Sequence, residues 1–426
     1  MTSLHIKSAR LIDPANQQDT VTDVYINDGV VLAIGEAPAN YKNNKVIDAD
    51  GLWLLPGIVD LSVYLREPGQ ENKATIQHEM NVAIRSGITT VCAMPEPLSP
   101  IDSSARINLI NEKAQAAKAT QVEIIGALMD GLKGEQLSNM GGLKKAGCVA
   151  VSQGLEPIHG LNLLRKSMEY AATLDLKLFY QPIEHSLLAG GCAHEGAIAT
   201  RLGLPPISTA VETTAMAQML MLVEETNTSV HFCRLSCAKS VELLKQAKAK
   251  GLPVTADVAA HQLFLTEMDI SDFNTLCNTL PPLRSERDRD ALREGVATGV
   301  IDAICSDHQP HDIDAKLSPF QQSSTGISAL ETLLPLTLRL VEEGVISLQQ
   351  AISCVTHKSA AIINKSKGSL AIGQVADFVL FDPTQYLDIS LDTFQSKGKN
   401  SPFFGWNFNG RVVSTAIAGN IIFHQR

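Results

Sequence analysis

Short apolar runs alternate with polar residues and turn signals at both ends of this chain. Near the start they cover residues 4–6, 21–26, 30–34 and 45–48, and near the end they cover 376–381 and 412–423. Short strands at this spacing are typical of an antiparallel sheet. We therefore expect one small β-sandwich built from both termini, over residues 1–53 and 366–426.

The middle of the chain has a different pattern, in which buried apolar strands alternate with amphipathic helices. Helix-like periodicity covers, among others, residues 160–174, 210–226, 240–249 and 286–299. Strand candidates are residues 57–60, 89–94, 122–127, 148–152, 177–180, 229–233, 254–258 and 301–305. Strand-then-helix units repeated over about 310 residues favour a (β/α)8 TIM barrel, here residues 54–365, over an open sheet. The expected fold class is α/β, with any chemistry at the C-terminal ends of the barrel strands.

Composition and charge narrow the choice of partners. The chain has 426 residues, 45% of them hydrophobic, and a formal net charge of −10. No basic stripe is available for phosphates, so nucleic acid is not an expected partner. The N-terminus has no apolar signal region and no uninterrupted apolar run approaches a membrane span, which predicts a cytoplasmic protein that does not bind membranes. Eight scattered cysteines without Cys-x-x-Cys pairs are typical of reduced core thiols.

Several motifs in the middle region give the chain a family resemblance. They include Leu65-Arg-Glu-Pro-Gly69, Pro281-Pro-Leu-Arg284 and Ser306-Asp-His-Gln-Pro-His311. Their order and spacing resemble the dihydroorotases of pyrimidine biosynthesis, which are members of the amidohydrolase superfamily. The segment 368–382 is similar to part of the β-sandwich in that family. The resemblance implies a TIM barrel with metal ligands at its strand ends.

The positions of those ligands are occupied by other residue types here. Where the resemblance implies imidazole or carboxylate ligands, this chain has Ser62, Tyr64, Gln153, Gln181 and Arg234, and only Asp307 is retained. One carboxylate cannot hold a catalytic zinc ion, which needs about three protein ligands. We therefore expect a degenerate site with no catalytic residues, no metal and no other cofactor.

Two arginines carry the remaining hypotheses about this site. Arg234 could pair with Asp307 and replace the positive charge of the metal, which would keep a buried aspartate from lying unpaired. Arg66 matches the carboxylate-binding arginine of the family, so residual anion binding is one interpretation. A structural ion pair with Glu67, Glu96 or Asp60 is the alternative.

The substitutions make the chain resemble the non-catalytic dihydroorotase-like chain that accompanies aspartate carbamoyltransferase in some bacteria. This resemblance implies a pseudoenzyme that serves as an assembly subunit. Its partner would be the catalytic chain of aspartate carbamoyltransferase, and it would form a homodimer within a larger hetero-oligomer. Residues 312–324 could contact that partner, or could be an ordinary surface loop.

Two other functions stay open at this point. The first is a cyclic amide hydrolase of the dihydroorotase type with a rearranged or metal-free site, in which Asp307 could act as a base. The second is a small-molecule sensor that binds an anionic metabolite through Arg66 and Arg234.

Overall fold

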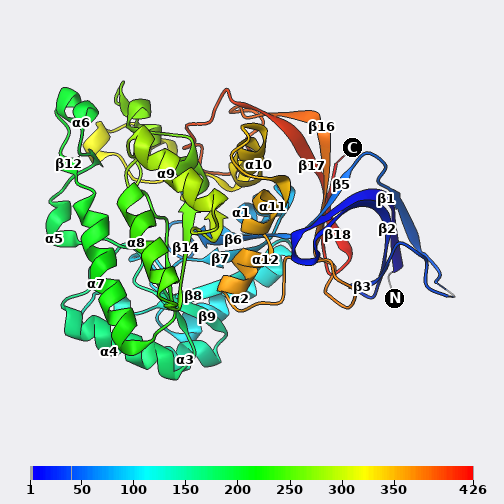
Figure 1. The fold of residues 1–426 in the computed structure, drawn as a ribbon, viewed down its shortest axis with the longest axis horizontal. Coiled ribbons are helices and arrows are strands. Elements are labelled where there is room, and N and C mark those ends of the chain that lie inside the picture. The colour runs from blue at the N-terminus through cyan, green and yellow to red at the C-terminus, as the bar shows by residue number, and fades with distance from the viewer. Residues whose placement is uncertain (1–2, 40, 426) are drawn as a thin grey trace.

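The computed structural model describes residues 3–39 and 41–425, which form a barrel and a separate sheet beside it (Figure 1). The barrel sheet has eight parallel strands in the order β15-β14-β13-β10-β9-β8-β7-β6. These strands are β6 (Ile58–Val63), β7 (Ile88–Ala93), β8 (Gln121–Ala127), β9 (Cys148–Ser152), β10 (Lys177–Tyr180), β13 (Val230–Phe232), β14 (Val254–Ala259) and β15 (Ala303–Cys305).

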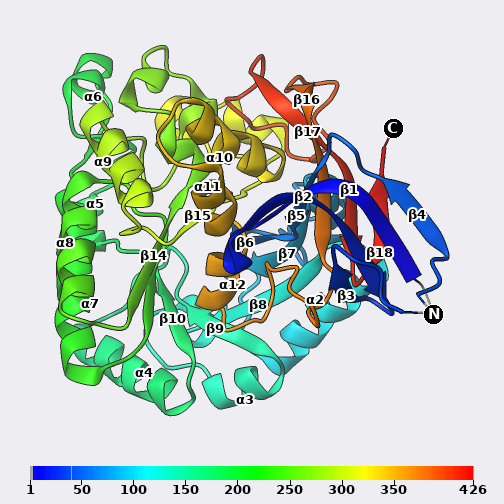
Figure 2. The same cartoon turned by 45° about the vertical axis from the view of Figure 1, so that its right-hand side comes forward.

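Helices surround the barrel strands on the outside (Figure 2). They are α1 (Ile76–Arg85), α2 (Ser104–Ala117), α3 (Met140–Lys145), α4 (Leu161–Thr173), α7 (Ala210–Thr226), α8 (Ala238–Ala249), α9 (Glu286–Ala297), α10 (Leu333–Glu342), α11 (Leu348–Cys354) and α12 (His357–Ile362). A small excursion after β10 contains α5 (His185–Leu188), β11 (Ala193–His194), α6 (Ala197–Leu202) and β12 (Pro206–Ile207). None of the helices in the described ranges combines the length and apolar character needed to cross a membrane.

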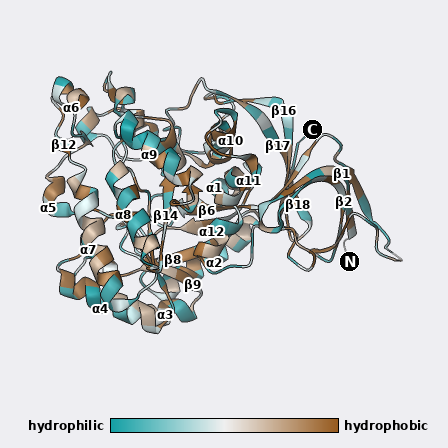
Figure 3. Cartoon of the chain, in the orientation of Figure 1, coloured by the Kyte–Doolittle hydropathy of each residue, from teal (hydrophilic) through white to brown (hydrophobic). Residues whose placement is uncertain are grey.

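Burial explains why the barrel strands are apolar without alternation. Every residue of β6 and β7 is buried, because one face packs inside the barrel and the other packs against helices. The interior is filled by side chains such as Leu61, Cys92, Phe179 and Cys305. The helices carry both hydrophobic and hydrophilic residues, which fits one buried and one exposed face (Figure 3).

The second sheet joins the two ends of the chain. Its main order is β18-β17-β16-β5-β1-β2-β3, with β4 paired to β1. Antiparallel pairing of β5 with β16 connects the N-terminal and C-terminal parts. The strands are β1 (Ser3–Asp13), β2 (Gln18–Asn27), β3 (Val30–Ile34), β4 (Lys45–Asp48), β5 (Trp53–Pro56), β16 (Phe378–Asp388), β17 (Asn407–Ile417) and β18 (Asn420–His424).

The predicted fold class is confirmed: the chain is α/β, with a nearly closed parallel barrel and a separate sheet formed from both termini. The boundaries at 53/54 and 365/366 stay predictions. Residues 312–324 contain the short 3-10 helices Ile313–Lys316 and Phe320–Gln322, and both interpretations of this segment stay open.

Candidate functional site: a guanidinium at the end of the barrel

The barrel closes where the first strand meets the segment after the last one. The backbone N–H of Tyr64 donates to the carbonyl of His308 (2.9 Å), and the N–H of His308 donates to the carbonyl of Ser62 (3.1 Å). This closure brings the side chains of β6 next to those after β15. As a result, the Ser62 hydroxyl donates to Asp307 Oδ1 (3.2 Å).

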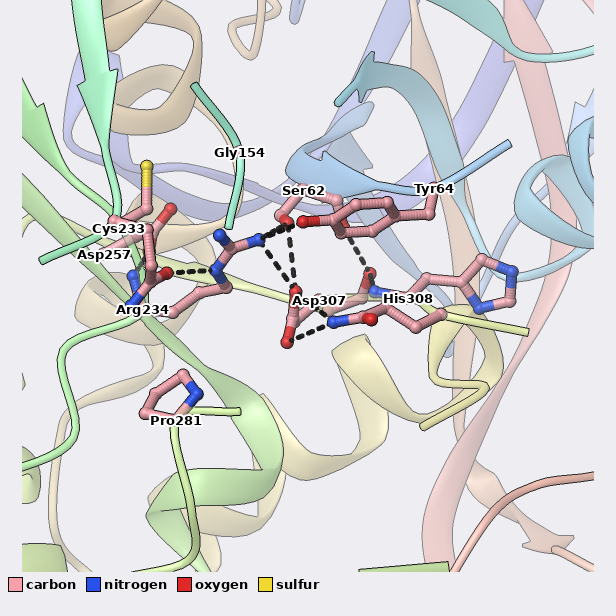
Figure 4. Close-up of polar contacts among 12 residues, drawn as sticks. Ser62, Tyr64, Gly154, Cys233, Arg234, Asp257, Pro281, Asp307 and His308 are labelled. Carbon is pink, nitrogen blue, oxygen red and sulfur yellow. Dashed lines mark hydrogen bonds and ion pairs between the residues drawn. The ribbon is translucent and has the colours of Figure 1, made fainter. Parts of the chain in front are cut away.

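Arg234 is fully buried at these strand ends (Figure 4). Together with Ser62, Tyr64, Gln181 and Asp307 it forms a group that we call the strand-end cluster. Arg234 Nη1 donates to Ser62 Oγ (2.9 Å), to Tyr64 Oη (3.3 Å) and to Asp307 Oδ1 (3.0 Å). Its Nε donates to Gln181 Oε1 (2.6 Å). The structure thus brings together five of the six residues that we expected at the degenerate site. The predicted pairing of Arg234 with Asp307 is present.

Gln153 is the sixth expected residue, and its amide is directed elsewhere. Its Nε2 donates to the carbonyl oxygens of Leu132 (2.7 Å) and Pro157 (3.3 Å). Gln153 therefore belongs to the wall beside the cluster and not to the hydrogen bonds around Arg234. The assignment of Gln153 to the degenerate site stays a prediction, and the structure places it beside Gln181 in the lining of one pocket.

Two further carboxylates, Asp257 and Asp60, adjoin the cluster and were not predicted as part of the site. Asp257 Oδ1 accepts from the backbone N–H of Arg234, and its Oδ2 lies 3.0 Å from His231 Nε2. Asp60 accepts hydrogen bonds from the backbone and the hydroxyl of Ser306. Both aspartates interrupt buried apolar strands, and that is the signal in the sequence that could have identified them.

Burial raises the pKa values of three acids at the site. It raises the pKa of Asp60 to about 7, against the hydrogen bonds from Ser306. It also raises the pKa of Asp307, and the Arg234 guanidinium opposes that shift. Desolvation of the phenol raises the pKa of Tyr64. The cluster therefore combines a fixed cation with acids that bind protons more readily than in water.

Three charged residues at the site have backbones in the left-handed region. Arg66, Arg234 and Asp307 have φ of 61°, 51° and 51°. Such conformations cost about 1–3 kcal/mol at non-glycine residues and persist where the surroundings fix them. At these strand ends the surrounding hydrogen bonds hold the three backbones in place.

The donor set does not fit a zinc ion. Within residues 3–39 and 41–425, no group of three or more His, Cys, Asp or Glu could hold a metal. Zinc in proteins is bound by thiolate, imidazole and carboxylate. Here the Arg234 guanidinium is hydrogen-bonded to a hydroxyl, a phenol, an amide and the Asp307 carboxylate, and it already provides a positive charge.

Arg66 lies in the wall of a neighbouring pocket and is paired with an acid. Its Nη1 is 2.7 Å from Glu96 Oε2, its Nε donates to the carbonyl of Pro310 (3.1 Å), and its Nη2 lies 3.2 Å from His311 Nε2. Of the structural alternatives for this arginine, the structure has the pair with Glu96. The pocket has a volume of about 260 Å³ and is also lined by Tyr64 and Gln309. Anion binding by Arg66 stays a prediction.

Comparison with known proteins gives a consistent family. Residues 53–422 match the model of the amidohydrolase family. A dihydroorotase-like protein of Pseudomonas aeruginosa is 43% identical over 419 residues, covering 98% of this chain and 99% of the relative. A dihydroorotase of Geobacter sp. (strain M21) is 38% identical over 421 residues, covering 99% of each chain.

Solved structures show the same fold. An L-hydantoinase (dihydropyrimidinase) from Arthrobacter aurescens superimposes with a TM-score of 0.88 at 24% identity, covering 100% of this chain and 96% of the other. A dihydropyrimidinase from Brevibacillus agri superimposes with a TM-score of 0.85 at 22% identity, covering 99% and 95%.

The expectation that this chain is not an enzyme is wrong by these comparisons. Full-length relatives with 36–38% identity are named dihydroorotases, so the homologues point to enzymatic hydrolases. The expectation relied on the replacement of residues at the ligand and substrate positions of the family. A guanidinium and a carboxylate at the same strand ends still offer a positive charge and a base.

Proposed function

Because this chain belongs to the amidohydrolase family and aligns with dihydroorotases over nearly its whole length, we propose that it hydrolyses a cyclic amide of the dihydroorotate type without a metal. The observation that carries the proposal is the Arg234–Asp307 pair. It combines a fixed cation and a carboxylate at the strand ends where TIM-barrel enzymes have their active sites. The proposal places the substrate in the neighbouring pocket, whose lining residues Tyr64 and Gln309 are hydrogen-bonded to Arg234 and Asp307.

The proposed chemistry uses a free donor of Arg234. Its Nη2 is buried and has no hydrogen-bond partner among the described residues. A fixed donor of this kind stabilises the negative charge that develops on a carbonyl oxygen. Asp307 takes a proton from water, and the hydroxide oxygen adds to the amide carbon. Cleavage of the ring C–N bond then returns the proton to the leaving nitrogen.

The test is ring opening of dihydroorotate by chelator-treated protein. We expect turnover by the parent chain and a loss of roughly a hundredfold or more in Asp307→Asn, the range seen when a general base is removed. Asp302→Asn is the matched control, because Asp302 pairs with Lys248 away from the cluster. Absence of turnover by the parent chain, or equal loss in both variants, would overturn the proposal.

We also propose that the chain associates with the catalytic chain of aspartate carbamoyltransferase, as a homodimer within a larger complex. The observation in favour is a pair of exposed apolar side chains in the segment that follows His311, a residue that lines the Arg66 pocket. Ile313 and Leu317 are 70% and 73% exposed. Buried Lys316 and Phe320 anchor residues 312–324, so this surface is held in place. Ordered apolar side chains suit a protein interface.

Association is tested by mixing the separately purified chains and measuring the mass of the complex. We expect one hetero-oligomer, which is lost in Ile313→Ser/Leu317→Ser. The control is Ile372→Ser/Leu391→Ser, since these two side chains are equally apolar and exposed but lie in the C-terminal region. If the transferase assembles and works equally well alone, the proposed association is wrong. This result is independent of the turnover assay.

A further inference from the structure

The connection between β16 and β17 leaves the terminal sheet and reaches the barrel beside α10 (Figure 1). Within it, residues 395–400 lie against α1 and against the segment that follows β15, and we call them the bracing segment. None of these residues takes part in the hydrolysis proposed above. Their contacts nevertheless lead to the pocket in which the substrate is placed.

Two carboxylates of the barrel hold the beginning of the bracing segment. Glu331, just before α10, accepts from the backbone N–H groups of Gln395 (2.7 Å) and Ser396 (3.1 Å). Glu79 of α1 has no exposed surface and accepts from the Ser396 hydroxyl (2.8 Å) and the backbone N–H of Lys397 (3.1 Å). The bracing segment is therefore fixed to two parts of the barrel as well as to the sheet.

Asn400 ends the bracing segment and holds the turn at residues 309–311. This side chain is only 2% exposed. Its Nδ2 donates to the carbonyl oxygens of Gln309 (2.9 Å) and Gly326 (3.0 Å), and its Oδ1 accepts from the backbone N–H of His311 (2.8 Å). One side-chain amide thus satisfies backbone groups on both sides of Pro310, which leaves this turn little freedom to move.

Gly398 brings the backbone of the bracing segment against the same turn. A Cβ at this position would lie 2.6 Å from Pro310 Cβ and 2.7 Å from the backbone nitrogen of His311. The φ of Gly398 lies outside the left-handed region, so only this close approach opposes a side chain there. A larger residue would push Pro310 and His311 away from the bracing segment.

The turn held in this way contacts Arg66. Arg66 Nε donates to the carbonyl of Pro310 (3.1 Å), and its Nη2 lies 3.2 Å from His311 Nε2. Arg66 and His311 both line the pocket of about 260 Å³. A guanidinium binds a carboxylate best through two parallel N–H groups, so its direction matters as well as its charge.

We propose that Asn400 and Gly398 are positioning residues for Arg66. Through Pro310 and His311 they set the direction of the guanidinium, and so the affinity of the pocket for a carboxylate. Neither residue is among the described residues that line the pocket. A connection between two strands of the terminal sheet thereby determines binding in the barrel. This inference rests on the proposed function in taking dihydroorotate as the ligand.

Gly398→Ala tests the proposal by pushing on the turn from outside the pocket. We expect this variant to bind dihydroorotate about tenfold more weakly than the parent chain in calorimetric titration, because a small misplacement of a binding group is costly. Asn400→Ala removes the hydrogen bonds to the same turn and should give a similar loss. In the turnover assay the loss should appear in KM, with kcat within about twofold, because Arg234 and Asp307 keep their contacts.

Gly191→Ala is the matched control, because a Cβ at Gly191 would lie 2.4 Å from the carbonyl oxygen of Pro206, in the excursion after β10. It should lower the melting temperature as Gly398→Ala does and leave dihydroorotate binding unchanged. Equal weakening in Gly191→Ala, unchanged affinity in both bracing-segment variants, or no binding by the parent chain would overturn the proposal. Selective weakening in a chain that binds dihydroorotate without turnover would support this inference and contradict the proposed hydrolysis.

Discussion

Arg234 is the centre of the hydrogen bonds at the strand ends. It contacts side chains from three different strand ends and has no exposed surface. A buried ion pair contributes little net stability, but removing one partner costs roughly 3–5 kcal/mol, because the other charge is left unpaired. Replacing Arg234 or Asp307 alone should therefore destabilise the fold more than replacing both.

Glu96 controls the charge that Arg66 offers to a ligand. Its carboxylate lies 2.7 Å from Arg66 Nη1, so it competes directly with the carboxylate of any substrate. We expect Glu96→Gln to bind dihydroorotate about tenfold more tightly by calorimetry, or about 1.4 kcal/mol. Its melting temperature without ligand should fall, because the buried guanidinium loses its counter-charge.

Glu156→Gln is the control for this change, because Glu156 lines the same pocket without pairing with Arg66. It removes the same charge and tests whether a general reduction in negative potential explains the effect. Equal tightening in the two variants would contradict a specific role of the Arg66–Glu96 pair.

His261 makes the fold sensitive to acid. Burial, with a smaller contribution from Arg234, lowers its pKa to about 3. Between the usual pKa near 6.5 and about 3, the unfolded chain binds a proton that the folded chain does not, so the free energy of unfolding falls as the pH falls. From pH 7 to 5 this costs about 2 kcal/mol.

His261→Gln should therefore lose about 2 kcal/mol less stability than the parent chain over that interval, as measured by urea unfolding at both pH values. The same substitution at exposed His78 is the control. If the two variants respond alike to pH, burial of His261 does not cause the acid sensitivity.

At the scale of the elements, strands and helices were largely predictable. The strand expected over 177–180 and the helix expected over 210–226 have those bounds in the structure, and the helix expected over 160–174 forms as Leu161–Thr173. Buried parallel strands appear as continuous apolar runs, and surface helices repeat every three to four residues, so local sequence carries both signals. The two-residue strands β11 and β12 carry no such signal.

The contacts of the site could be predicted only in part. The pairing of Arg234 with Asp307 was expected, because the resemblance to dihydroorotases implies that both residues occupy positions of metal ligands. We did not predict the hydrogen bond from Arg234 to Gln181 or the different direction of the Gln153 amide. Both depend on how neighbouring strands are staggered. That stagger is set by packing of the whole barrel, which no local motif encodes.

Helix caps provide a prediction at this scale. Ser285 is the N-cap residue of α9, and its Oγ accepts from the N–H of Asp288 (3.3 Å). Ser103 is the N-cap residue of α2, and its side chain makes no capping hydrogen bond. Ser285→Ala should lower the free energy of unfolding by about 1 kcal/mol, since an orphan N–H loses its acceptor. Ser103→Ala should change it little. Urea unfolding of both variants measures the difference, and equal effects would contradict the capping role.

At the scale of the whole molecule, the barrel and the sheet are joined by direct contacts. The chain passes from β5 in the sheet straight into β6 of the barrel. Buried Glu79 of α1 accepts from the Ser396 hydroxyl (2.8 Å) and from the backbone N–H of Lys397 (3.1 Å). Changes at the strand ends of the barrel should therefore affect the stability of the molecule as a unit.

Because the barrel and the sheet are joined, the effect of removing a metal can be measured through the stability of the whole molecule. A tightly bound ion that contacts only the folded chain would stabilise it by several kcal/mol, and its removal would lower the melting temperature. With Arg234 in place at the strand ends, we expect treatment with a strong chelator to leave the melting temperature and the oligomeric mass unchanged. Calorimetry and mass measurement before and after treatment check this, with added zinc as the reverse experiment. A fall on chelation that zinc restores would mean that the guanidinium does not substitute for a metal.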